Sequence, residues 1–260
     1  MAGEYLHFYG AYRGKAEIAD PHFHTDYSDG MLSPQRAVKW AAKNGLHTIV
    51  VADHNTREGA LRAQEHAQKT NARVKVVVGE EVTSKRGHIL GVNLTEDIPK
   101  GLSVEDTIAR IKEQGGLVII PHPDQPNAYG LSLEKDVEPL IGTDYSPHGI
   151  EVINANLRRA QHVPVLGRRL YPVDSQRQTR HFIGRYNREF AVIGGSDSHG
   201  LALAHAATAF DGDDFLQAVK DRQTSAIARY DLFKHGIVDM FFQVYTAYIR
   251  DKVRKIKYKV

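Results

Sequence analysis

The sequence has no cysteine among its 260 residues, which excludes disulfide bonds and thiolate metal ligands alike. Any transition-metal site must therefore use histidine nitrogen and carboxylate oxygen as ligands. A chain without cysteine also fits a reducing compartment, so we expect a cytoplasmic protein.

Long apolar runs are missing as well. No stretch approaches the roughly 18 to 20 apolar residues of a membrane span, and residues 1–17 lack the apolar segment of a signal peptide. Neither charge is in large excess, because 34 Lys and Arg oppose 31 Asp and Glu, so net charge alone does not indicate nucleic-acid binding. With 42% hydrophobic residues, we expect one substantial core in a soluble protein.

Short β-branched runs alternate with helical patterns along most of the chain, which is typical of βα units around a parallel sheet. Serine followed by proline, or by an acid three residues later, marks the start of two of the helices. The predicted strands are 17–21, 47–52, 74–79, 117–121, 149–153 and 190–195. The predicted helices are 33–44, 57–70, 103–115, 133–141 and 213–222.

The last thirty residues differ in character. Apolar side chains recur in steps of three and four over 231–260, and Lys and Arg crowd the final turns, which predicts an amphipathic helix with a basic end. We expect the apolar stripe to pack on the catalytic domain and the cations to lie near the helix C-terminus. A homo-oligomer, membrane-surface or nucleic-acid contact through this helix stays open.

Histidines and acids cluster where predicted strands end. In a strand alternate side chains share a face, so His22 and His24 can reach one ion, as can Asp197 and His199. His54, Glu81 and His122 also follow or end strands, and His88 opens a following one. Since ligands of barrels and open α/β sheets bind at the carboxyl ends of strands, these side chains should meet at one rim.

Five of these segments, in this order, resemble the motifs of the PHP (polymerase and histidinol phosphatase) domain family, in its small stand-alone phosphoesterase form. They are PHFHTDYSDGMLSP, ADHN, GEEV, Pro121-His122-Pro123 and GSDSHG, and the resemblance covers about residues 17–210. One departure is Pro21, where the family usually has an aliphatic residue. The resemblance implies a distorted (βα)7 barrel, so we expect a catalytic domain over 1–230, followed by the amphipathic helix predicted from periodicity over 231–260.

The resemblance also implies a centre of two or three divalent ions, Zn, Mn or Fe. The first ion would take His22, His24, Glu81 and Asp197; the second Glu81, His88 and His122; the third Asp29, His54 and His199. Glu81 is chosen over Glu80 because the acid in the family's Gly-x-Glu-Val motif directly precedes the apolar residue. Asp20 and Asp53 would orient ligand histidines by accepting from the other ring nitrogen, or serve only as turn or cap residues.

Residues that would contact the substrate carry a weaker signal. Arg158 and Arg159 follow the fifth predicted strand and could bind phosphate in bidentate fashion, and Asn154 or Asn156 could orient the substrate. The polar, Arg-rich region 154–189 is a candidate lid, in which His162, His181, Arg180 and Arg185 are weaker candidates.

Three divalent ions would outweigh the charge of three carboxylates, so the site favours a compact polyanion. We expect hydrolysis of a phosphate monoester of a small metabolite or nucleotide by a metal-activated hydroxide, with Glu81, Asp197 and His199 as the central catalytic residues. The alternatives are a 3′-exonuclease or phosphodiesterase acting on nucleic acid, carbonyl hydrolysis of the amidohydrolase type, and a non-catalytic metal-stabilised scaffold.

Overall fold

The structure is a computed structural model that describes residues 5–10, 17–125, 129–156, 175–186, 189–200 and 203–229. Its strands form one sheet in the order β1-β10-β9-β2-β3-β4-β5-β6-β7-β8. The strands are β1 (Tyr5–Gly10), β2 (Glu17–Phe23), β3 (Thr48–Val51), β4 (Lys75–Thr83), β5 (His88–Val92), β6 (Leu117–Ile120), β7 (Gly149–Asn154), β8 (Ala191–Gly195), β9 (Ala206–Phe210) and β10 (Thr224–Arg229).

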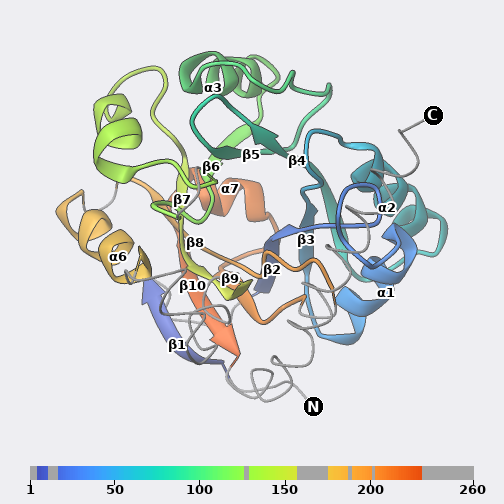
Figure 1. Ribbon diagram of the computed structural model, residues 1–260. Helices are drawn as coiled ribbons and strands as arrows, with labels where there is room; N and C mark the ends of the chain where they lie inside the picture. The colour runs from blue at the N-terminus through green and yellow to red at the C-terminus, as the bar shows by residue number, and fades with distance from the viewer. Residues whose placement is uncertain are drawn as a thin grey trace, which may run out of the picture.

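Strands β2 to β8 curve into a nearly closed barrel (Figure 1). Most neighbours are parallel, but β5 runs antiparallel to both β4 and β6. The first and last barrel strands meet in a short seam, where the His24 N–H donates to Ser198 O at 3.0 Å and the Asp197 N–H donates to His22 O at 2.8 Å. The seam therefore places the segments after β2 and β8 side by side.

Three further strands extend the sheet beyond the barrel. Strand β9 pairs antiparallel with β2, β10 pairs with β9, and β1 pairs with β10. The sequence analysis did not predict these strands, because runs such as AATAF are rich in alanine and lack a β-branched signal.

Helices α1, α2, α3 and α6 lie around the barrel (Figure 1). Ser33 and Ser103 cap α1 and α3 by accepting from the backbone N–H three residues on, as the sequence predicts, because those first-turn N–H groups have no partner inside the helix. The helices are α1 (Pro34–Lys43), α2 (Glu58–Lys69), α3 (Val104–Glu113), η1 (Leu133–Val137), η2 (Glu138–Leu140), α6 (Ser175–Arg185) and α7 (Phe215–Lys220).

The inside of the barrel is filled with apolar side chains from alternate strand positions, and α7 packs among them. Phe215 and Val219 of α7 belong to the same buried cluster as Ala19, Leu117 and Ala191, which lie near the amino ends of their strands. With this end filled by apolar packing, the open end is the one to which the carboxyl ends of the parallel strands point.

The expected α/β barrel is confirmed, with local differences. The predicted helix 133–141 is a π-helical turn followed by a 3₁₀ turn, and α6 lies in the polar region that the sequence analysis left without elements. Residues 231–260 lie outside the described part, so the predicted C-terminal helix and the boundary at 230 stay predictions. No helix within the described ranges is both long and apolar enough to cross a bilayer.

Candidate metal centre

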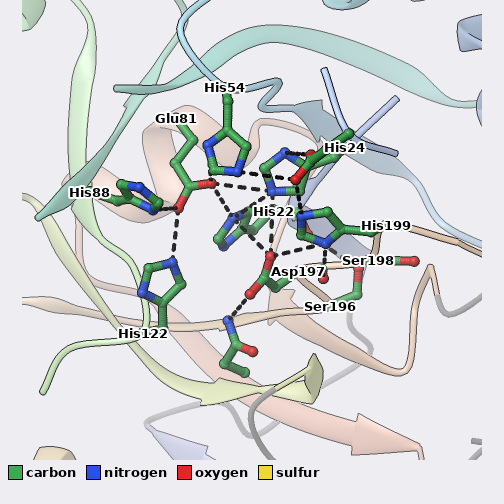
Figure 2. A network of polar contacts seen from close by, with 12 residues as sticks. His22, His24, His54, Glu81, His88, His122, Ser196, Asp197, Ser198 and His199 are labelled. Atoms are coloured by element: carbon green, nitrogen blue, oxygen red, sulfur yellow. Dashed lines mark hydrogen bonds and ion pairs between the residues drawn. The ribbon is translucent and has the colours of Figure 1, made fainter. Parts of the chain in front are cut away.

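All nine predicted metal ligands gather at the carboxyl end of the barrel, and Figure 2 labels all of them except Asp29. The barrel strands and the loops that follow them deliver these side chains from six segments of the chain. The nine residues are His22, His24, Asp29, His54, Glu81, His88, His122, Asp197 and His199.

Glu81 has histidines on both of its carboxylate oxygens (Figure 2). Its Oε1 is 2.9 Å from His88 Nδ1 and 2.9 Å from His122 Nε2. Its Oε2 is 3.2 Å from His54 Nδ1 and 3.3 Å from His24 Nε2. A carboxylate with imidazoles on both of its oxygens can bridge two cations, which is the arrangement expected for Glu81 from the sequence.

Glu80, its neighbour, points away from the cluster because successive side chains of a strand face opposite sides. Glu80 is buried, and its Oε2 accepts from the Ile98 N–H at 3.0 Å. The geometry therefore agrees with the choice of Glu81 over Glu80.

Two further carboxylates complete the cluster. Asp197 Oδ1 lies 3.4 Å from His24 Nε2 and 3.5 Å from His22 Nε2. Asp29 is 47% exposed, and its Oδ2 lies 3.2 Å from His199 Nε2 and 3.6 Å from His54 Nε2. Asp29, His54 and His199 thus form the solvent-facing side of the cluster, whereas His22 and His24 are enclosed.

Four overlapping groups among the described residues have ligand atoms close enough to surround one ion. They are His24, Asp29, His54 and His199; His22, Glu81 and His122; His22, His24 and Asp197; and His54, Glu81 and His88. These groups divide the residues differently from the three predicted sets, because His54 also faces Glu81 and His24 also faces Asp29. A neutral imidazole offers one lone pair, so His24 can serve only one of its two groups at a time.

A second observation, independent of the ligand distances, indicates a cation site. His24 Nδ1 is buried without a hydrogen-bond partner, although it points toward Asp29 at 3.8 Å. A buried imidazole nitrogen usually has a partner, so an unpartnered one beside carboxylates and other imidazoles is a nitrogen available to bind a cation.

The acid and histidine charges support the same conclusion. Burial would raise the pKa of Asp197, but the imidazoles of His22 and His24 hold that pKa well below its usual range. Burial would lower the pKa of His24, yet its hydrogen bonds to Asp197 and Glu81 raise the pKa to about 10. The carboxylates thus stay ionised, and without an ion they draw protons onto nearby imidazoles, protons that a metal would displace.

His54 behaves differently, because burial lowers its pKa to about 4 despite the attraction of Glu81. This imidazole is therefore neutral near pH 7 and keeps a lone pair for a ligand bond.

Two candidate ligands have strained backbones. His122 and Asp197 have positive φ angles of 27° and 46°, which side-chain-bearing residues rarely adopt. Both backbone N–H groups are tied down, His122 by Glu151 Oε2 at 2.8 Å and Asp197 by His22 O at 2.8 Å. Strain held by its surroundings at such a cluster is typical of functional sites.

The expectation that Asp20 and Asp53 orient ligand imidazoles is wrong. Asp20 accepts from the backbone N–H groups of Ser196 and Ala204, at 3.0 and 2.9 Å, so it fixes the chain after β8. Asp53 accepts from Thr25 instead of a histidine ring. Both carboxylates hold the loops that carry ligands, in keeping with the turn role that the sequence analysis left open.

Outside the nine candidate ligands, the carboxylate that faces a ligand ring is that of Glu151, which was not predicted from the sequence. Its Oε1 lies 3.3 Å from His22 Nδ1, and the side chain is buried in β7. A signal was present, because Glu151 is the lone charged residue in the apolar strand GIEVIN, and a charge is rarely buried without a partner.

A cavity of about 230 Å³ opens above the cluster. Asn156 lines it, as the sequence analysis expected of a substrate contact, together with Gln125 and Tyr129, which were not predicted. Arg158, Arg159 and His162 lie outside the described residues. His181 and Arg185 line a separate cavity between η1 and α6.

Comparison with known proteins places the chain in a family. An uncharacterized protein of Methanocaldococcus jannaschii is 38% identical over 148 residues, which cover 53% of this chain and 81% of that protein. A 5′-3′ exoribonuclease of Haemophilus influenzae is 29% identical over 117 residues, 42% of each chain, so the match spans less than half of that enzyme.

Among solved structures, a two-domain protein of Bacteroides vulgatus that contains a predicted PHP-like metal-dependent phosphoesterase aligns with a TM-score of 0.61. It is 20% identical, and the alignment covers 88% of this chain and 70% of that one, which shows a shared fold. The PHP domain family model matches residues 20–211, the part of the chain that carries every member of the cluster. The chain therefore belongs to the PHP domain family and is a metal-dependent phosphoesterase.

Proposed function

We propose that this protein hydrolyses the phosphate monoester of a small metabolite or nucleotide, with two or three divalent ions held by the nine clustered residues. The observation that carries this proposal is the single cavity over the cluster. Seven of the nine candidate ligands line its wall, and only His22 and His24 do not. A substrate in this cavity would face nearly the whole cluster.

The size of the cavity favours a small reacting group. Pockets for drug-sized ligands commonly measure about 300 to 1,000 Å³, and this one holds about 230 Å³. A phosphoryl group and the first atoms of its leaving group fit such a volume, whereas the rest of a larger substrate would extend past Tyr129 into solvent.

The charge of the site favours a dianion. Only three carboxylates belong to the cluster, and the imidazole of His54 is neutral near pH 7. Two or three divalent ions would leave a positive site, and such ions supply Lewis acidity for transfer of a phosphoryl group to water. A phosphate monoester carries two negative charges near pH 7 and matches that charge best.

The side chains of the cluster and of the cavity wall have different expected roles in binding and catalysis. Glu81 fixes His88 and His122 at the floor through hydrogen-bond distances of 2.9 Å. Asp197 holds the enclosed histidines, and His199 stands at the solvent side beside Asp29, where a leaving group would depart. Because Asn156, Gln125 and Tyr129 line the cavity, we expect them to contact the leaving group.

A second candidate function is cleavage of a nucleotide from the end of a nucleic acid. The similarity to a protein named as a 5′-3′ exoribonuclease favours this candidate, and an open cavity could admit a chain end. A non-catalytic scaffold has no comparable observation in its favour.

The test combines metal content with turnover. Protein purified without chelator is analysed for metal per chain, then assayed with Mn²⁺ for phosphate release from sugar, amino-alcohol and nucleoside monophosphates and for nucleotide release from short RNA. His22→Ala and Asp197→Ala are the test variants, and Asp213→Ala, an exposed acid, is the control.

Two or three ions per chain with monoester turnover that both variants lose would support the proposal. Turnover of RNA alone would favour the second candidate. Protein that stays metal-free after reconstitution with Mn²⁺ or Zn²⁺ would overturn the centre itself.

A further inference from the structure

Strand β7 supplies none of the nine candidate ligands, yet two of its polar side chains point into the cluster. Glu151 and Asn154 are both buried, with exposed fractions of 2% and 1%. Residues three apart in a regular strand face opposite sides of the sheet, so this shared direction requires an irregularity.

The irregularity is a bulge. Between β7 and β8 the register shifts, so that Glu151 pairs with Ile193 while Ile153 pairs with Gly194, and Val152 is the extra residue. Val152 and Ile153 consequently both pack in the apolar cluster outside the barrel, and Asn154 turns inward beside Glu151. Bulges of this kind redirect side chains next to functional sites.

The Glu151 carboxylate contacts two candidate ligands from different strands. Its Oε1 lies 3.3 Å from Nδ1 of His22, and its Oε2 accepts the backbone N–H of His122 at 2.8 Å. His122 has the strained φ angle of 27°, so this hydrogen bond holds the backbone of the same residue whose side chain is a candidate ligand.

Asn154 extends the contact to a third candidate ligand. Its amide Nδ2 donates to Glu151 Oε2 at 2.8 Å and to Asp197 Oδ2 at 3.1 Å. One pair of side chains thus touches His22, His122 and Asp197, which come from the ends of β2, β6 and β8.

Gly195 leaves room for this carboxylate. A Cβ built on Gly195 would lie 2.2 Å from Glu151 Oε1 and 2.9 Å from Cβ of His22, both closer than real Cβ atoms approach. The strand that follows β7 in the sheet is therefore shaped around the Glu151 side chain.

We propose that Glu151 and Asn154 act as a positioning pair, which sets the His22 tautomer, the His122 backbone and the Asp197 carboxylate for metal binding. The inference rests on the metal centre of the proposed function and not on the identity of its substrate. Neither residue lines the cavity above the cluster, so we expect neither to contact the substrate.

The tautomer argument is specific to a carboxylate. An ionised carboxylate only accepts, so Glu151 keeps a proton on Nδ1 of His22 and leaves Nε2 as the nitrogen that can bind an ion. In Glu151→Gln the amide oxygen would face the two donors of His122 and Asn154, which leaves the NH₂ group toward His22. That group donates to Nδ1, forces the proton onto Nε2 and blocks the ligand bond.

The experiment measures ion affinity on metal-stripped protein, with Mn²⁺ and Zn²⁺ titrated against a chromogenic chelator. The proteins are wild type, Glu151→Gln, His22→Ala, the double variant of these two, and Asn154→Ala. Glu113→Gln is the matched control, because this glutamate is 63% exposed on the outer helix α3. Urea unfolding of each metal-free protein measures stability separately.

We expect Glu151→Gln to weaken the affected ion about 10- to 100-fold, the usual effect of residues that orient a ligand histidine. In the His22→Ala background the same change should have little further effect, because the tautomer no longer matters. Asn154→Ala should weaken binding by a smaller factor, and the control should bind as wild type does.

Unchanged ion affinity in Glu151→Gln, with or without a loss of stability, would overturn the inference and leave a purely structural role. If the effects of Glu151→Gln and His22→Ala on ion affinity were fully additive, the proposed action of Glu151 through the His22 ring would be overturned. Wild-type protein that binds no ion would overturn both the metal centre and the positioning pair. Ions bound without phosphate release would overturn only the substrate proposal and would leave the role of the pair supported.

Discussion

Asp53 accepts two hydrogen bonds from Thr25, one from the backbone N–H at 2.7 Å and one from the hydroxyl at 2.6 Å. A third comes from the Ser28 hydroxyl at 2.6 Å. The carboxylate after β3 thus fixes the loop that begins at His24 and carries Asp29, the solvent-facing acid of the cluster. Gly59 admits this contact, since a Cβ there would lie 2.0 Å from Asp53 Oδ2.

Replacing Asp53 should therefore affect both stability and metal binding. We expect Asp53→Ala to lower the free energy of unfolding by about 3 kcal/mol, because it leaves the buried donors of Thr25 without a charged acceptor. Urea unfolding of the metal-free protein measures the loss, and Asp213→Ala is the exposed control. An unchanged midpoint would show that the loop holds its shape without Asp53.

The adjacent glutamates offer a matched pair of variants. Glu81→Gln should reduce turnover by at least about 100-fold, beyond the usual loss for residues that only support a ligand, because Glu81 faces histidines on both oxygens. Glu80→Gln should keep turnover and metal content, since an amide oxygen can still accept from the Ile98 N–H. Burial raises the pKa of Glu80 to about 7, so a neutral group is already tolerated there. Equal losses in the two variants would contradict the assignment of Glu81.

A pH effect is expected at His148, far from the cluster at the start of β7. Burial, followed by the nearby Lys112, lowers its pKa to about 4, and its Nδ1 accepts from the Val118 N–H at 2.9 Å. The unfolded chain binds this proton more readily, so the stability that His148 contributes is present above about pH 6.5 and is lost as the pH falls toward 4.

His148→Asn keeps an acceptor near the same place but does not titrate. Between pH 7.5 and 4.5, we expect wild type to lose about 1 to 2 kcal/mol more stability than this variant. Urea unfolding with chelator present at both pH values gives the comparison, and the other histidines cancel in the difference. Parallel losses in the two proteins would rule out this role.

Tyr129 provides a test of the leaving group. Its side chain is 51% exposed at the edge of the cavity, and its ring centroid lies 5.4 Å from that of His88. Stacking of a base on an aromatic ring contributes about 1 to 3 kcal/mol. Tyr129→Ala should raise KM for nucleoside monophosphates about 5- to 100-fold and change KM for glycerol phosphate much less, with Tyr145→Ala as exposed control. Equal effects on both substrates would argue against a stacked base.

The barrel strands and the candidate ligands were readable from the sequence for a shared physical reason. Apolar runs such as TIVV mark buried strands, and a histidine or acid at the end of such a run must emerge at the carboxyl edge of the sheet. The meeting of His22, His54 and Asp197 follows from that rule together with the barrel topology.

The features that could not be predicted from the sequence depend on the pairing register and the direction of the strands. The antiparallel course of β5 arises from the short connection after β4, and apolar periodicity is the same for both directions. Glu151 and Asn154 share a face only because Val152 is an extra residue in the pairing, and a strict period of two predicts the opposite. Helix α6 is polar apart from a few residues such as Phe182 and Ile183, so its pattern gave little signal.

The seam of the barrel links ion binding to the opening of the sheet. The hydrogen bonds His24 N–H to Ser198 O and Asp197 N–H to His22 O join the first and last barrel strands within the same residues that face the cluster. An ion shared by His22, His24 and Asp197 would bind residues on both sides of this junction. Its binding would therefore oppose separation of the two strands, and its release would favour it. Amide hydrogen exchange at His24 and Asp197 should then slow when the ion is bound, and its removal would make it easier to expose the strand edge at this seam.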